Sequence, residues 1–122
     1  MTIKVLGIDS ASKRSGFALY KDRRLNKLAV FDSNESLSLG GRLIEFQQQV
    51  KDFMPCDLVV IEKVSKSRNL NTVRMLAYFE AAAIIEAEKA GAKVAKRARR
   101  TKAEGHSARW PVHFSRAALF VD

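Results

Sequence analysis

"VLGIDSASKRSGFALY" (residues 5–20) contains two β-rich runs joined by a short polar segment, and a single acid, Asp9, ends the first run. The joining residues "SASKRS" favour turns, so the two runs predict neighbouring antiparallel strands. The next run, "LNKLAVF" (residues 25–31), alternates and predicts a third strand of a meander. One face of that strand is expected to carry Leu25, Lys27, Ala29 and Phe31.

The hydrophobic period changes after the meander. From residue 39 to residue 53 the apolar residues are spaced 4, 3, 4 and 3 apart, which places them on one face of a helix that ends before Pro55. They are Leu39, Leu43, Phe46, Val50 and Phe53. The run "LVVIE" (residues 58–62) is nearly all apolar, as parallel strands buried on both faces usually are, and it ends in Glu62.

A second helix is predicted over about residues 69–90, with Gly91 just after its end. The residues "AKVA" (92–95) then begin a candidate fifth strand. The order β-β-β-α-β-α-(β) predicts an α/β fold, in which a right-handed crossover places the strand of residues 58–62 beside the first strand and parallel to it. Asp9 and Glu62 would then stand side by side at the carboxyl edge of the sheet, where ligand sites of α/β proteins lie.

Two neighbouring carboxylates repel each other unless a cation or a proton intervenes. Oxygen ligands without histidine or thiolate favour Mg²⁺ or Mn²⁺, with waters and substrate phosphates completing the coordination. The net charge of +9 indicates a polyanionic partner, and together these features point to phosphodiester chemistry. Other interpretations stay open: Asp9 caps a turn, Glu62 pairs with Lys63 or with a nearby arginine, and the positive charge serves solubility.

Two motifs also carry a family resemblance. "GIDSASKRSGFAL" and "LVVIEKVSKSRNLNTVRMLAYFEAAAI" resemble the motifs of the RuvC-like Holliday-junction resolvases of the ribonuclease H-like superfamily, over about residues 3–95. The resemblance implies a mixed five-stranded sheet flanked by helices, with Asp9 and Glu62 as the metal-ligating catalytic residues. It also implies a homodimer that cuts two opposed strands of a four-way DNA junction during recombination and repair. Two departures are Ser10-Ala11, where Pro-Gly is usual, and the lack of an aromatic residue soon after Glu62.

Several polar residues flank the expected site and are candidates for nucleic-acid contacts. They are Lys13, Arg14, Lys66, Arg68, Asn69 and Arg74. Such contacts position a backbone without reading its sequence, and the alternative is that these residues form a solvated surface turn.

The chain divides at about residue 95 into a ribonuclease H-like core (1–95) and a basic, poorly patterned tail (96–122). The core holds 15 Lys and Arg against 11 Asp and Glu, whereas the tail holds 7 against 2, so over half of the net charge lies in the tail. The tail lacks the family's further pair of acids in an Asp-x-x-Asp pattern, and only Glu104 and Asp122 offer carboxylates there. We therefore hypothesise a truncated or frame-shifted remnant of a longer resolvase.

Other classes are disfavoured by composition. The single cysteine, Cys56, cannot form an internal disulfide, and the spacing of His106 and His113 matches no zinc motif. No apolar run approaches the roughly 20 residues that span a bilayer, and we expect a cytoplasmic protein. The leading prediction is a Mg²⁺-dependent endonuclease for branched DNA. The alternatives are a catalytically incomplete DNA-binding protein of the same fold and a ribonuclease H-like RNA-processing nuclease.

Overall fold

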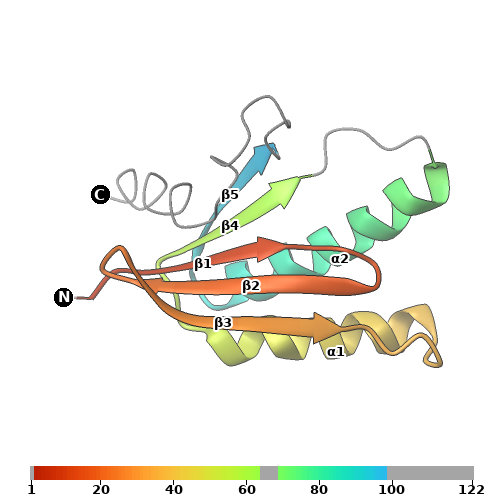
Figure 1. The fold of residues 1–122 in the computed structure, drawn as a ribbon, viewed down its shortest axis with the longest axis horizontal. Coiled ribbons are helices and arrows are strands. Elements are labelled where there is room, and N and C mark those ends of the chain that lie inside the picture. The colour runs from red at the N-terminus through yellow and green to blue at the C-terminus, as the bar shows by residue number, and fades with distance from the viewer. Residues whose placement is uncertain (1, 64–68, 99–122) are drawn as a thin grey trace.

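The computed structural model describes residues 2–63 and 69–98 of the chain (Figure 1). Seven elements follow one another in the predicted order. They are β1 (Lys4–Asp9), β2 (Arg14–Lys21), β3 (Arg24–Asp32), α1 (Leu39–Phe53), β4 (Leu58–Lys63), α2 (Leu70–Lys89) and β5 (Lys93–Ala98). The described helices include none that is both long and apolar enough to cross a membrane.

The strands form one five-stranded sheet in the order β3-β2-β1-β4-β5. The pairs β1/β2 and β2/β3 are antiparallel, while β1/β4 and β4/β5 are parallel. The mixed sheet, the meander and the crossover that sets β4 beside β1 are therefore confirmed. Strand β5 runs to Ala98 and so continues the sheet beyond the expected boundary at residue 95.

A two-residue turn joins β2 to β3, with Lys21 paired to Arg24 across it. Both turn residues have positive φ, 50° at Asp22 and 70° at Arg23. The register then shifts, because Leu19 pairs with Lys27 and Tyr20 with Leu25. This irregularity moves Leu25 to the face that Tyr20 occupies. The expected alternation is thus correct from Lys27 onward and wrong at Leu25.

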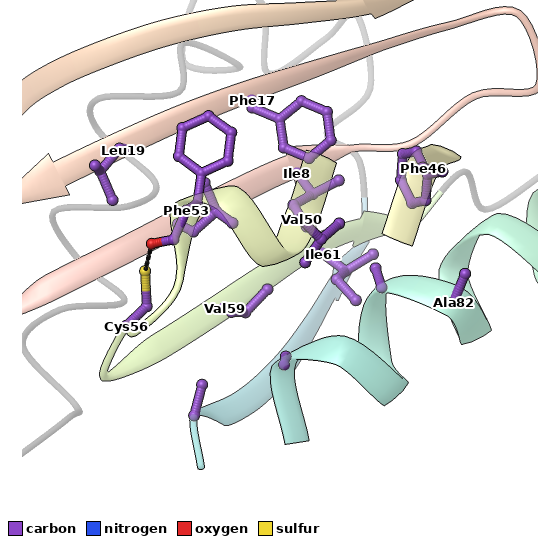
Figure 2. Packing of buried hydrophobic residues seen from close by; sticks show 14 of the residues in the cluster. Ile8, Phe17, Leu19, Phe46, Val50, Phe53, Cys56, Val59, Ile61 and Ala82 are labelled. Atoms are coloured by element: carbon purple, nitrogen blue, oxygen red, sulfur yellow. Dashed lines mark hydrogen bonds between the residues drawn. The ribbon is translucent and has the colours of Figure 1, made fainter. Parts of the chain in front are cut away.

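Helices α1 and α2 both pack on one face of the sheet (Figures 1 and 2). Phe46 of α1 is fully buried, and its ring centroid lies 5.7, 5.6 and 5.1 Å from those of Phe17, Phe31 and Phe79. Cys56 is buried in the same cluster and donates from Sγ to the carbonyl of Phe53. Figure 2 shows this contact at the turn into β4. The aromatic cluster therefore joins α1 to α2 and to strands β2 and β3.

The helix ends follow the sequence signals. Ser38 caps α1 by accepting from the N–H of Gly41, and Met54 follows the helix before Pro55. Asn69 caps α2, while Gly91 follows its end with φ +82°, the conformation expected of a glycine there. Both helices were predicted within one residue of these bounds.

The other face of the sheet carries a second cluster of buried side chains, namely Val5, Ala18, Tyr20, Leu58 and Val60. Strand β4 contributes to both clusters, as expected for a central parallel strand. Burial raises the pKa of Tyr20 to about 12. Asp9 and Glu62 alternate in phase with these residues, so they lie on this second face at the end of the sheet.

Candidate functional site

Asp9 and Glu62 are register partners across the parallel pair β1/β4. Asp9 is the last residue of β1 and Glu62 is the last but one of β4, so both stand at the carboxyl edge of the sheet. Adjacent strands lie about 4.8 Å apart, and register partners project to the same side. Asp9 and Glu62, which the sequence predicts to stand side by side, are therefore neighbours in the sheet.

The neighbours of this pair differ on its two sides. On β2 the register partner of Asp9 is Gly16, which has no side chain. On β5 the partner of Glu62 is Arg97, which is half-buried. Glu62 itself is only 5% exposed, whereas Asp9 is half-buried. Arg97 was not among the predicted site residues, because residues after 95 were assigned to the tail. The available signal was the candidate strand that begins with "AKVA" (92–95), which reaches Arg97 when it is continued by two residues.

The turn after Asp9 is held by hydrogen bonds from several elements. The hydroxyl of Ser15 accepts from the N–H of Ala11 at 3.0 Å and donates to the carbonyl of the same residue at 3.1 Å. The N–H of Ser33, just after β3, donates to the carbonyl of Lys13 at 2.8 Å. These bonds fix the backbone that leaves β1.

Arg42 of α1 completes this support. Its Nε donates to Ser33 Oγ at 2.8 Å, and its Nη2 donates to the carbonyl of Ser12 at 2.5 Å. The guanidinium also lies over the ring of Phe79, 5.7 Å from the centroid. One half-buried side chain therefore ties the turn after Asp9 to both helices. No short-range sequence signal marked Arg42 for this role.

The candidate nucleic-acid residues are placed in different ways. Lys13 is exposed in the turn after Asp9, and Arg74 is exposed near the start of α2. Arg14 donates from Nε to Asp32 at 2.7 Å, and this hydrogen bond and charge raise the pKa of Arg14. The side chain of Asn69 accepts from two backbone N–H groups as the cap of α2. Lys66 and Arg68 lie outside the described residues, as do His106, His113, Glu104 and Asp122.

Two solved structures share this architecture. T. thermophilus RuvC in complex with a Holliday junction substrate superposes with a TM-score of 0.72 over 98% of this chain and 90% of that chain, at 16% identity. A second structure, of Thermus thermophilus RuvC, superposes with a TM-score of 0.72 over 96% of this chain and 80% of that chain, at 18% identity. The chain has the RuvC fold. No family model matches the sequence, and no curated protein matches it.

Within this RuvC fold, the pair Asp9 and Glu62 has the composition that suits a hard divalent cation. Mg²⁺ is commonly held by one or two carboxylates, with waters and substrate phosphates completing an octahedron. Residues 2–63 and 69–98 contain no group of three or more His, Cys, Asp or Glu side chains arranged to hold a metal. The described part of the chain therefore brings two carboxylates together at this edge, and Arg97 stands next to one of them.

Proposed function

We propose that the protein is a divalent-metal-dependent endonuclease for branched DNA, with four-way junctions as its substrate, acting in recombination and repair. The observation that carries this proposal is the register pairing of Asp9 with Glu62 at the carboxyl edge of the sheet. The net charge of +9 supports a nucleic-acid substrate, since phosphates bind lysine and arginine with release of counterions. The junction complex of RuvC, which has the same fold, supports the choice of substrate.

Each residue near the edge has a defined part in this proposal. Asp9 and Glu62 hold Mg²⁺ or Mn²⁺, which in such sites activates a water and stabilises the leaving oxygen of a phosphodiester. The hydrogen bonds of Ser15 and Arg42 keep the turn after Asp9 in one position, so that the Asp9 carboxylate is oriented before the substrate arrives. Lys13, exposed on that turn, binds a backbone phosphate near the scissile bond.

Cutting two opposed strands of a junction requires two sites, and an exposed stripe on α2 supports a homodimer. Val73, Ala77, Ala81 and Ile85 are all exposed and follow one another at intervals of four residues. The two alanines in the middle of this ridge have small side chains, which allow a second α2 to approach closely in an isologous contact. Ala81→Arg should therefore give a monomer in sedimentation velocity, while Ala81→Ser should leave the dimer intact. A dimer that survives Ala81→Arg would exclude this surface.

A second candidate is a DNA-binding protein without nuclease activity. The observation that favours it is Arg97, whose positive charge beside Glu62 opposes a bound cation. In that case junction binding would persist in EDTA and no divalent ion would produce nicks.

Cleavage of a labelled four-way junction in Mg²⁺ or Mn²⁺ tests these candidates. The nuclease proposal expects paired, symmetric nicks from the wild type and none from Asp9→Asn, with junction binding retained. Asp52→Asn, on the exposed side of α1, removes one carboxylate elsewhere and should cut normally. A gel shift without nicks supports the binding protein, and cleavage confined to RNA substrates supports the RNA-processing alternative. Wild-type cleavage by Asp9→Asn would remove Asp9 from the chemistry.

A further inference from the structure

The end of the sheet opposite to Asp9 and Glu62 is strongly basic. Lys4 pairs with Lys21 across β1/β2, and Lys21 pairs with Arg24 across β2/β3, so three cations form a row over three strands. Like charges that face each other across strands destabilise a sheet. No described residue forms an ion pair with any of the three. The folded chain therefore holds three like charges together without an ion pair from the described residues.

Two more cations and two acids complete this end. Arg23 and Lys27 are exposed beside the row, and Lys27 Nζ lies 5.3 Å from the centroid of the Phe53 ring. The acids are Asp22 and Asp57. Their carboxylates accept the backbone N–H groups of Ile3 at 2.8 Å and Lys4 at 2.7 Å. Five cations against two acids leave the hairpin end positive.

Arg23 occupies a position that favours glycine. Two-residue hairpin turns with positive φ at both residues prefer Asn-Gly or Asp-Gly, and here the turn is Asp22-Arg23 with φ 70° at the arginine. A non-glycine residue in this conformation costs on the order of 1 kcal/mol. The turn therefore holds the exposed guanidinium of Arg23 in a strained backbone conformation. No hydrogen bond or ion pair among the described residues accounts for an arginine at this position.

Hydrogen bonds also fix the backbone of the hairpin end. The N–H of Asp22 donates to the carbonyl of Ile3 at 2.8 Å, and the N–H of Ile3 returns a bond to the Asp22 carboxylate. Figure 1 shows this turn at the end of the sheet opposite to the arrowhead of β1. The five steps along β1 from Lys4 to Asp9 span about 17 Å at roughly 3.3 Å per residue. Lys4 alternates in phase with the buried residues on the helix side of the sheet, whereas Asp9 lies on the other face.

From this arrangement we infer that the basic hairpin end, formed by Lys4, Lys21, Arg23 and Arg24, is a second phosphate-binding site that holds a duplex arm of the DNA away from the carboxylate edge. The inference deepens the proposed function and rests on it for the identity of the polyanion. Binding at the hairpin end supplies affinity and orientation, whereas the chemistry belongs to the other end of the sheet. Loss of this site should therefore weaken DNA binding without changing the cleavage step.

The test uses Arg23→Gly, because glycine accepts the turn conformation and the variant should melt at or above the wild-type temperature. Binding of a labelled junction is measured by fluorescence anisotropy in EDTA between 50 and 200 mM salt. Each phosphate contact removed should lower the slope of log K against log salt by about 0.9, so Arg23→Gly/Arg24→Gln should lower it by about 1.8. Lys51→Gln, an exposed residue on α1, removes one charge and should leave the slope unchanged.

An unchanged slope in the double variant would overturn the inference, as would an equal fall in Lys51→Gln. Binding of the wild type to anionic lipid vesicles but not to DNA would assign the hairpin to a membrane surface and would also overturn it. The readout is free of metal, so a wild type that binds the junction with the expected slopes but never cuts it refutes the nuclease alone. If the wild type cuts, Arg23→Gly should cut at the wild-type rate once the junction is saturating.

Discussion

Replacing Arg42 tests whether the turn after Asp9 is held from α1. Arg42→Ala removes two hydrogen bonds from a charged donor and one contact with the face of Phe79. Bonds of this kind contribute roughly 1.5–3 kcal/mol each, and a partly exposed cation–π contact about 0.5 kcal/mol. Because Arg42 is half-buried, we take the lower figures, which gives an expected loss of about 3.5 kcal/mol in the free energy of unfolding.

The functional consequence lies in the turn itself. Without Arg42 the carbonyl of Ser12 loses its partner on α1, and the segment from Ala11 to Lys13 keeps only its bonds to Ser15 and Ser33. Backbone amides there should exchange with solvent faster than in the wild type, and Mn²⁺ should bind more weakly. Arg42→Lys keeps the charge, but its single ammonium group cannot reproduce the forked geometry, so it should recover only part of the loss.

Urea unfolding measures the free energy of unfolding, and hydrogen exchange measures the protection of the backbone amides of residues 11–13. Titration with Mn²⁺ measures the affinity for the metal. Arg14→Ala is the matched control, since its ion pair with Asp32 lies close by but is mostly exposed and should contribute little. A loss below about 1 kcal/mol in Arg42→Ala, with unchanged exchange between residues 11 and 13, would refute the reasoning. If stability falls while Mn²⁺ affinity stays at the wild-type value, Arg42 supports the fold but does not position Asp9.

Three further predictions follow from single side chains. Burial raises the pKa of Cys56 to about 11, against the charge of Lys4, which lowers it, and with that of Asp57, so the thiol should not react with a disulfide reagent at pH 8 until urea unfolds the chain; rapid labelling of the folded protein would contradict this. Tyr20, with its pKa raised by burial to about 12 against 10 when unfolded, stays protonated while the unfolded chain ionises, so stability should fall by about 2 kcal/mol between pH 10 and pH 12; urea titrations should show a flatter decline in Tyr20→Phe and an unchanged one in Tyr78→Phe. Gly91→Ala should destabilise by about 1 kcal/mol because of its φ of +82°, whereas Gly40→Ala, in open space within α1, should stabilise slightly; equal melting shifts for the two variants would argue against this.

The pairing of Asp9 with Glu62 could be predicted from sequence because its causes are local or general. Two apolar runs each end in an acid, and the preference for right-handed crossovers leaves few ways to arrange the strands between them. Hydrophobic spacing likewise placed α1, and helix-favouring residues followed by Gly91 placed α2, each to within a residue. These features depend on short stretches of chain and on the handedness of the backbone.

The missed features depend on contacts between distant residues. Strand β5 is an edge strand rich in charge, so its last residues resemble a basic tail until its neighbours are known. Lys96 turns to the helix side, where its Nζ lies 2.7 Å from a carboxylate oxygen of Glu80, and Arg97 is left beside Glu62. The register shift that moves Leu25 arises in the same way, since a hydrophobic pattern does not reveal an irregular pairing.

The distribution of charge along the sheet bears on how such a protein would engage DNA. Under the proposed function a scissile phosphate arrives at the edge that carries Asp9 and Glu62, and without a cation the carboxylates there repel the DNA backbone. Arg97 offsets that repulsion in part from β5, and Lys13 does so from the turn after β1. The basic hairpin end lies about 17 Å away, beyond the screening length of about 8 Å at physiological salt. It can therefore hold a duplex arm with little influence from the carboxylates, which allows DNA affinity and metal-dependent chemistry to vary independently.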